Sequence, residues 1–300
     1  MIDQKLTTLI AVNKFKNFSK AANHLGLTQP AVSTHIKLLE EEYKIKIFNK
    51  NEKELILTNE GLVLLKYAKR IDSLYNLISE AIENEKKHIK SLTIGMTHTA
   101  ENSDIPKVLA AYTLEKEDVK EVKNIKIISD DIKNIYNKLK TYEIDLAIVE
   151  GRFPDKDFNT VLLDTDSLVL IVANDNPLSK KKIVSINELK KEKLILRLPN
   201  SDSRIRFEAA LKNFNIDIND FNITLELDSI SVIKNLVSDN YGVSIIAKSS
   251  CLEDIKKGYF KMINVENLSM VREINLIYHQ DFEHLDFINE LIELYHSYNN

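Results

Sequence analysis

Three polar side chains recur at four-residue spacing near the N-terminus, at Gln29, Ser33 and Lys37. A helix places residues four apart on one face, and apolar residues at positions 32, 36 and 39 fall on another. Amide and hydroxyl groups donate and accept hydrogen bonds as base edges require, and lysine attracts phosphate. An ordinary exposed helix face carries Glu–Lys pairs, yet the first acid here is Glu40. The pattern favours contact with a nucleic acid.

Two short helices joined by a tight turn are predicted to position these side chains. Ser19 is the expected N-cap of the first helix, and Gly26 supplies the left-handed residue that ends it. Thr28 is the expected N-cap of the second helix, whose first turn holds Pro30, where a missing N–H costs nothing. Two adjacent alanines let the helix axes approach closely. This is the geometry of a helix-turn-helix.

Basic residues gather in the N-terminal part of the chain. Residues 1–90 carry 15 Lys and Arg against 11 Asp and Glu, whereas residues 91–300 carry 26 against 34. Such a local excess steers a domain toward phosphate, although a small basic patch by itself is commonly just solvated surface. The segment 45–58 alternates in polarity around positions 51–53, which predicts a hairpin wing that carries Lys50 and Lys53 toward a nucleic-acid backbone.

The segment 59–89 reads as one long amphipathic helix, with Thr58 or Asn59 as its cap. Its apolar residues recur every three or four positions, at Leu62, Leu65, Ala68, Ile71, Leu74, Ile78 and Ile82. Nothing nearby in sequence is long enough to cover so narrow a stripe. The expected cover is the same helix of a second copy of the chain. Packing on its own domain is the alternative.

Residues 91–300 alternate short apolar runs with helical patterns, which is the sequence form of α/β units. Strands are expected near 92–96, 125–129, 145–149, 167–172, 194–198, 223–227 and 243–247. Helices are expected at 105–117, 131–142, 203–214 and 229–239. About 200 residues with this many strands tend to form two lobes.

The chain resembles a known family, the LysR-type transcriptional regulators. The matching positions in the N-terminal part are Leu6, Phe18, Ser19, Ala21, Ala22, Leu25, the run Leu27 to Ser33, Ile36, Leu39, Glu40, Phe48, Leu57, Thr58, Gly61, Tyr67 and Ala68. The resemblance implies an N-terminal all-α winged helix-turn-helix with a long linker helix, followed by a C-terminal α/β two-lobed effector-binding domain similar to type 2 periplasmic-binding proteins. The implied bounds are 1–58 for the DNA-binding domain, 59–89 for the linker and 90–300 for the effector domain, with lobe one at 91–164 and 270–300 and lobe two at 165–269.

The resemblance also implies partners and DNA-contacting residues. The partners are double-stranded DNA carrying an imperfect palindrome, a small-molecule effector, and a second copy of the chain joined through the linker helix; whether dimers pair into tetramers stays open. The residues implied in DNA binding are Thr28, Gln29, Pro30, Ser33, Thr34, His35, Lys37, Lys50 and Lys53. Family members often have Arg at the positions of Thr34 and Lys50, so a bidentate guanine contact is not assumed. His35 either substitutes in part for that contact, or it packs against a neighbour or is solvated.

The effector is expected between the lobes, at strand ends and helix starts. The candidate residues are Thr97, His98, Thr99, Ser129, Glu150, Asn200, Ser201 and Ser203. Hydroxyls beside helix N-termini suit an anionic effector, to which Arg204 or Arg206 would add charge, although Asp202 opposes it. The same hydroxyls also serve as plain N-caps. Arg152 is near enough in sequence to pair with Glu150.

Other classes of protein fit the sequence less well. The seven histidines show no metal-ligand spacing, and neither a glycine-rich phosphate loop nor a nucleophile motif is present. We therefore expect no cofactor, no metal and no enzymatic activity. No apolar run reaches the length of a membrane span and no cleavable signal is seen, so a cytoplasmic protein is expected. The single Cys251 is expected to be a buried, inert thiol. A solute-binding module without DNA-binding activity is the alternative.

Overall fold

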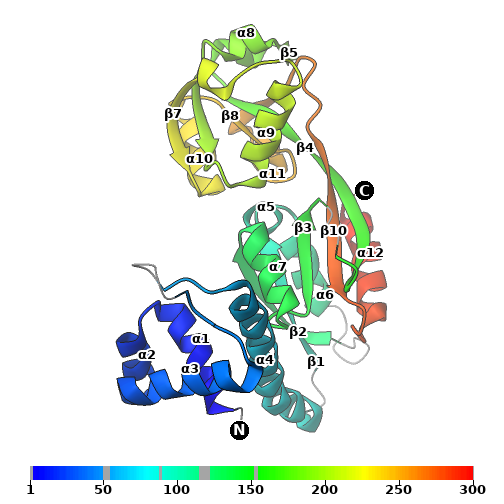
Figure 1. Ribbon diagram of the computed structural model, residues 1–300. Coiled ribbons are helices and arrows are strands. Elements are labelled where there is room, and N and C mark those ends of the chain that lie inside the picture. The colour runs from blue at the N-terminus through cyan, green and yellow to red at the C-terminus, as the bar shows by residue number, and fades with distance from the viewer. Residues whose placement is uncertain (1–2, 50–54, 88–89, 115–121, 152–154, 300) are drawn as a thin grey trace. The chain divides into compact units, whose positions relative to one another are not determined.

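The computed structural model describes residues 3–49, 55–87, 90–114, 122–151 and 155–299. The chain divides into two compact units, residues 1–90 with 140–143, and residues 91–139 with 144–300. The elements of both units are labelled in Figure 1. No helix among the described residues is long and apolar enough to cross a membrane.

The first unit is helical, with α1 Gln4–Phe15, α2 Phe18–Leu25, α3 Gln29–Tyr43 and α4 Asn59–Lys87. The helix-turn-helix is α2 and α3. Gly26 ends α2 at a φ of 66°, and the Thr28 hydroxyl accepts from the Ala31 N–H at the start of α3, as predicted. The expected cap at Ser19 was wrong, because Asn17 precedes α2 and its side chain accepts from the Lys20 N–H at 2.9 Å.

Helices α1 to α4 share one apolar core. Val32, Ile36 and Leu39 of α3 are buried as predicted. They pack with α1, with the two alanines of α2, and with Leu65 and Ala68 of α4. Phe48 and Leu57 form an antiparallel bridge, which is the base of the expected wing. Lys50 and Lys53, the predicted wing lysines, lie outside the described residues.

The linker helix α4 uses its apolar stripe in two ways. Leu65 and Ala68 are buried against their own domain, so the alternative of packing within the domain holds for this part. Five other members of the stripe remain about half exposed: Leu62, Ile71, Leu74, Ile78 and Ile82. Thr58 caps the helix, because its hydroxyl accepts from the Gly61 N–H at 2.9 Å.

The second unit is α/β. Its strands are β1 Lys90–Thr97, β2 Val122–Asp130, β3 Leu146–Glu150, β4 Phe158–Ala173, β5 Ile183–Val184, β6 Lys193–Arg197, β7 Asn222–Leu227, β8 Ser244–Ala247, β9 Phe260–Val265 and β10 Val271–His279. Its helices are α5 His98–Glu101, α6 Ile105–Leu114, α7 Ile132–Lys140, α8 Ile186–Leu189, α9 Asp202–Lys212, α10 Ile230–Ser238, α11 Leu252–Lys256 and α12 Leu285–Asn299, with short 3₁₀ turns at Pro177–Lys180 and Ile218–Asp220.

Two long strands connect the two lobes of this unit. The sheet order is β2-β1-β3-β10-β4-β9-β5, with β8 also on β4, and β6 and β7 form a separate parallel pair. Strand β4 pairs with β10 up to Ser167 and with β8 from Leu168 onward. The first part of β4 therefore belongs to lobe one, together with β1, β2, β3 and β10. Its second part belongs to lobe two, together with β5 to β9. Figure 1 shows β4 and β10 running between the lobes.

Apolar side chains cover both faces of each lobe. In lobe one, α6 and α12 pack on one face of the sheet and α7 on the other. In lobe two, α9 packs on one side and α10 on the other. Both pairings of β10, with β3 and with β4, are antiparallel, whereas β1 and β3 pair in parallel. The carboxyl ends of β1 and β3 consequently lie at one edge of lobe one.

Candidate functional site

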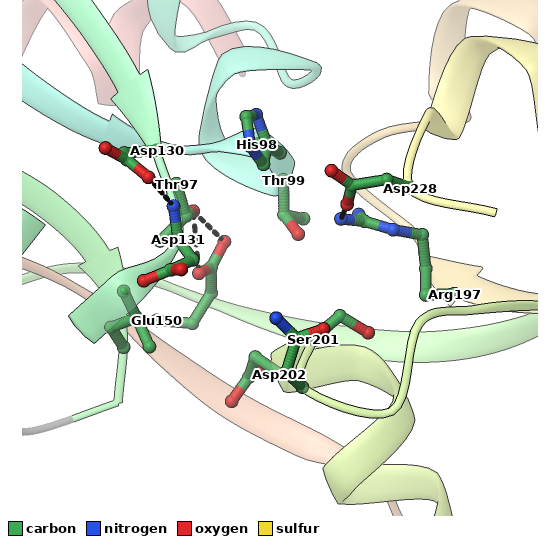
Figure 2. Close-up of a pocket in the computed structure, with 12 residues that line it drawn as sticks. Thr97, His98, Thr99, Asp130, Asp131, Glu150, Arg197, Ser201, Asp202 and Asp228 are labelled. Atoms are coloured by element: carbon green, nitrogen blue, oxygen red, sulfur yellow. Dashed lines mark hydrogen bonds and ion pairs between the residues drawn. The ribbon is translucent and has the colours of Figure 1, made fainter. Parts of the chain in front are cut away.

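A cavity of about 140 Å³ lies between the two lobes of the second unit. Lobe one contributes the turn after β1, the residues after β2 and the last residue of β3, and lobe two contributes the end of β6, the start of α9 and the residue after β7. The lining residues are Thr97, His98, Thr99, Asp130, Asp131, Ile132, Glu150, Arg197, Asn200, Ser201, Asp202 and Asp228. Figure 2 shows side chains from both sides directed into this space.

Helix starts place the hydroxyl groups. The Thr97 hydroxyl accepts from the Ala100 N–H at 3.2 Å at the start of α5. The Ser201 hydroxyl accepts from the Arg204 N–H at 3.4 Å and donates to the Leu198 carbonyl at 2.8 Å. Both side chains therefore cap a helix and line the cavity at once, so the two interpretations of these hydroxyls are compatible.

Glu150 is the buried carboxylate of the cavity. It is 2% exposed at the end of β3, and its two oxygens lie 2.9 and 2.7 Å from the Thr97 hydroxyl (Figure 2). Burial raises the pKa of Glu150 above its ordinary value, and the nearby Arg272 guanidinium opposes that rise. The Glu150 charge is thus poorly compensated by the protein around it.

Arg272 of β10 holds three carboxylates behind the cavity. Its side chain is fully buried and donates to Asp166 of β4 and to Asp202 of α9, both at 2.8 Å. Glu150 is farther away, at 3.8 Å. Because Asp202 lies in lobe two and Glu150 in lobe one, this one guanidinium contacts both lobes beside the connecting strand β4.

Most of the other charged side chains of the lining are acidic. Asp130 is the last residue of β2 and Asp131 follows it, and Asp130 pairs with Lys138 at 2.6 Å. Arg197, at the end of β6, is the one lining residue with a full positive charge among those described, and its Nη2 already pairs with Asp228 at 2.7 Å. The lining itself therefore holds more carboxylates than cations, and several of the carboxylates are paired with cations on or behind it.

On the first unit, α3 presents a polar face. Gln29 is exposed and its Nε2 donates to the Ser33 hydroxyl at 3.0 Å. Lys37 continues this face, with the Glu41 carboxylate 3.7 Å away. Pro30 and Thr34 are exposed beside that face. The Thr34 hydroxyl donates to the Pro30 carbonyl oxygen at 2.9 Å.

Comparison with known proteins assigns the chain to a family. Residues 86–299 match the LysR substrate binding domain, and residues 4–62 match the bacterial regulatory helix-turn-helix protein of the lysR family. The chain is a LysR-family transcriptional regulator. It is therefore a DNA-binding regulator with a second domain of the class that binds a small-molecule effector.

Relatives of this LysR-family regulator agree over nearly the whole chain. It is 31% identical over 273 residues to an uncharacterized HTH-type transcriptional regulator of Methanocaldococcus jannaschii, covering 90% of each chain. It is 31% identical over 281 residues to a probable RuBisCO transcriptional regulator of Phaeodactylum tricornutum, covering 91% of this chain and 89% of the relative. Full-length CbnR in complex with its target DNA has the same fold, with a TM-score of 0.65 at 16% identity and 99% of each chain covered.

The cavity of the regulator contains six of the eight side chains that the sequence indicated for an effector site. These are Thr97, His98, Thr99, Glu150, Asn200 and Ser201. Ser129 and Ser203 are not among the lining residues. The roles of all eight side chains stay predictions, because position in a cavity does not demonstrate contact with a ligand. Arg152 lies outside the described residues.

The two arginines that were expected to add charge do not line the cavity. Arg204 is buried and pairs with Glu208 at 2.5 Å and with Glu226 at 3.2 Å. Arg206 pairs with Asp202 at 2.8 Å. Each has its carboxylate partner on or beside its own helix, so neither guanidinium is directed at the cavity. Neither of these two charges therefore belongs to the lining.

Sequence reasoning missed most of the acidic lining. Asp130, Asp131, Arg197 and Asp228 were not selected, although each stands at or just after the carboxyl end of a strand. The same strand-end rule that selected Glu150 would have found them.

The structure also places two further side chains that the sequence singled out. The Nδ1 of His35 lies 2.8 Å from the hydroxyl of Thr8, a fully buried residue of α1, so His35 packs against a neighbouring helix. Cys251 is fully buried, and that burial raises the pKa of its thiol to about 12, as expected of an inert thiol.

Proposed function

We propose that the regulator binds an imperfect palindrome as a dimer, with α3 of each copy in successive major grooves. The observation that carries this proposal is the division of α3 into two faces. Val32, Ile36 and Leu39 are buried, whereas Gln29 and Lys37 are exposed. A recognition helix needs its core side chains fixed so that the opposite face presents donors and acceptors at constant positions.

Each side chain of this face has a distinct role in the proposal. Gln29 and Ser33 read base edges, and their mutual hydrogen bond fixes the amide orientation. Thr28, Pro30 and Thr34 pack beside the groove. Lys37 contacts phosphate, as do Lys50 and Lys53 of the wing. His35, held against Thr8, supports α3 from the side rather than reading a base.

The linker helix α4 is the proposed contact with the second copy of the chain. The half-exposed stripe on α4 is too apolar to remain in water along its whole length, and the same stripe on another copy is its natural partner. The proposed domain bounds are 1–58 for DNA binding, 59–89 for dimerisation and 90–300 for the effector domain. Whether dimers pair into tetramers is tested by sedimentation of the full chain, the same measurement that tests the dimer.

The effector binds in the cavity between the lobes and changes how the DNA-bound dimers pair. The cavity position supports this, since lobe one and lobe two both contribute side chains to it. A ligand that contacts both lobes favours one spacing between them. The related effector-binding domain of QuiR, solved in complex with shikimate, covers 70% of this chain at a TM-score of 0.56. We further propose a cytoplasmic protein without enzymatic activity or cofactor.

Fluorescence anisotropy with labelled duplex DNA tests the DNA-binding assignment. A binding site is first selected from a random duplex pool with the full chain, and affinity is then measured across salt concentrations. Replacing Lys37 with alanine should lower affinity for all sequences and reduce the salt slope by about 1. Lys257→Ala, an exposed lysine of the second unit, is the matched control and should leave the slope unchanged. Equal slopes for the two variants would remove Lys37 from the interface.

A further inference from the structure

The charges around the cavity differ from those that an anionic ligand needs. Five carboxylates line it, and three of them have a close cation: Arg197 for Asp228, Lys138 for Asp130, and Arg206 with Arg272 for Asp202. Glu150, whose nearest guanidinium is that of Arg272 at 3.8 Å, and Asp131 are the less compensated charges among those described. The carboxylates are Asp130, Asp131, Glu150, Asp202 and Asp228. A ligand carboxylate or phosphate would meet like charge from Asp131 and Glu150 of lobe one, and repulsion is stronger in a partly desolvated space than in water.

The helix start that suggested an anion site is already occupied. Asp202 stands in the first turn of α9, where the helix dipole favours negative charge. Its carboxylate also binds Arg272 and Arg206, each at 2.8 Å. The Ser201 hydroxyl takes up the Arg204 N–H. The positive end of α9 is thereby compensated from within the protein.

Glu150 has acceptor capacity that the protein does not fill. The Thr97 hydroxyl lies within hydrogen-bond distance of both carboxylate oxygens, but a hydroxyl has one proton and donates once. The Arg272 nitrogen nearest to it is 3.8 Å away and donates instead to Asp166. A carboxylate offers about four acceptor positions. This one has a side chain 1% exposed, is directed into the cavity, and receives one hydrogen bond from the described side chains (Figure 2).

We infer that the effector of this regulator carries a protonated amino group, which binds Glu150 and Thr97 between the lobes. The inference rests on the proposed effector function of the cavity and specifies its ligand class. An ammonium group supplies three donors: one satisfies a free acceptor position on Glu150, and another is within reach of the hydroxyl oxygen of Thr97. Asp131, which lines the cavity beside Glu150, then faces the rest of the ligand, so a second amino group or a hydroxyl-rich chain is favoured over a carboxylate.

A metal ion fits the cavity less well than an amine does. Among the described residues, no group of three or more His, Cys, Asp or Glu side chains is placed to hold a metal ion. Divalent cations need several oxygen ligands converging at short distance, whereas one buried carboxylate with a neighbouring hydroxyl suits a single ammonium.

Thermal shift and calorimetry on the full chain test the ligand class with defined probes. The amine probes are 1,4-diaminobutane, L-lysine and ethanolamine, the anionic probes are succinate and inorganic phosphate, and magnesium chloride is the metal probe, all at equal ionic strength and neutral pH. At least one amine probe should raise the melting temperature, because a ligand that binds the native state stabilises it by mass action. Glu150→Gln should weaken that binding by about tenfold to hundredfold.

Two variants accompany Glu150→Gln. Asp131→Asn removes a lining charge and keeps a side chain able to cap α7, whose Asn134 N–H bonds to Asp131 at 2.8 Å; it should weaken amine binding less than Glu150→Gln does. Asp239→Asn removes an exposed charge that does not line the cavity, and amine affinity should stay as in the unaltered chain. Equal amine affinity in all three variants would refute the placement at Glu150.

The probe series separates failure of the inference from failure of the effector function. Binding of succinate or phosphate, lost on Thr97→Val or Ser201→Ala, with no response to amines, overturns the amine class and leaves an effector site in the cavity. A response to magnesium chloride alone also overturns the amine class. Failure of every probe overturns the inference, while DNA binding by α3, measured separately by anisotropy, is unaffected by that result.

Discussion

Arg272 and Asp166 are register partners on β10 and β4, and the Arg272 guanidinium donates to the Asp166 carboxylate at 2.8 Å. The pair lies where β4 is about to exchange β10 for β8 as its neighbour. Asp166 also accepts from the Ser249 hydroxyl at 2.8 Å, so this carboxylate fixes Arg272 at the connection between lobes. The same guanidinium also donates to Asp202 of lobe two at 2.8 Å. This ion-pair network therefore joins the two lobes behind the cavity.

Arg272→Met is expected to destabilise the protein strongly. The substitution leaves Asp166 and Asp202 buried or half-buried without their cation, and breaking a buried ion pair by removing one partner costs about 3–5 kcal/mol. Urea denaturation followed by circular dichroism gives the free energy of unfolding. Lys190→Ala, which breaks the exposed pair with Asp220, is the control and should cost about 1 kcal/mol or less. A similar small change for Arg272→Met would mean that the network does not stabilise the fold.

Glu150 should make stability fall as pH rises. Its native pKa is raised, chiefly by burial and against the effect of Arg272, while Asp202 raises it further and the Thr97 hydrogen bond lowers it. The native state therefore holds a proton at pH values where the unfolded chain has lost it, and the free energy of unfolding decreases with pH through the window above 4.5, the ordinary value.

Glu150→Gln removes this titration. The variant should be as stable as the unaltered chain at low pH and at least as stable near neutral pH, because no buried charge has to form. Urea denaturation at a series of pH values measures the difference between the two proteins. A Glu150→Gln variant that loses stability increasingly toward high pH, relative to the unaltered chain, would show that the ionised carboxylate stabilises the fold and that the pKa of Glu150 is lowered rather than raised.

Local patterns were enough to predict the helix-turn-helix. Gly26, Thr28 and the apolar residues of α3 act within a few positions of one another, so spacing alone determines their roles. The cap of α2 shows the limit of this reasoning. Asn17 and Ser19 are both good capping residues, and the sequence does not say at which of them the backbone enters the helix.

The cavity was only partly predictable, because its charge is a tertiary property. The five lining acids come from four separate segments of the chain, and nothing in any one segment shows that these four meet. Arg272 lies on β10, and its partners Asp166 and Asp202 are 106 and 70 positions away in the sequence. The helix α12 was not predicted either, although its apolar face completes the core of lobe one.

Gly61→Ala should destabilise the first unit, contrary to the usual effect of this change in a helix. Alanine in a helix interior normally gains about 1 kcal/mol over glycine. Here an added Cβ would overlap the backbone carbonyl oxygen of Ile47, so α4 must move away from the segment before the wing. Thermal unfolding of the full chain and of Gly61→Ala is compared.

Gly26→Ala is the matched control for Gly61→Ala. Nothing lies within 4 Å of its added Cβ, but its φ is positive, so the change costs about 1 kcal/mol of backbone strain. Gly61→Ala should lower the melting temperature of the first unit more than Gly26→Ala does. A melting temperature for Gly61→Ala above that of the unaltered chain would show that α4 does not pack closely against the Ile47 carbonyl group.

Gln29→Ala should relax sequence specificity while leaving the salt dependence of DNA binding unchanged. A side chain that pairs with a base edge contributes about 1–3 kcal/mol of discrimination against the wrong base and releases no counterion. Anisotropy with the selected duplex and a scrambled one measures the ratio of affinities. Asn23→Ala, an exposed amide on α2, serves as the control. Equal loss of affinity for both duplexes would assign Gln29 to the phosphate backbone.

Leu74→Glu is expected to disrupt the dimer. Leu74 is 47% exposed in a single chain, so a carboxylate there has little effect on the fold of one copy, but it would be buried without a partner in a helix–helix interface. Sedimentation of the full chain at about micromolar concentration should show a dimer, and a monomer for the variant. Asn76→Glu introduces the same charge on another face of α4 and should remain dimeric.

Because two half-sites bound by a linked pair gain affinity from effective concentration, Leu74→Glu should also lose affinity for the full palindrome while keeping that for one half-site. A dimer that persists in Leu74→Glu would place the interface elsewhere on the chain.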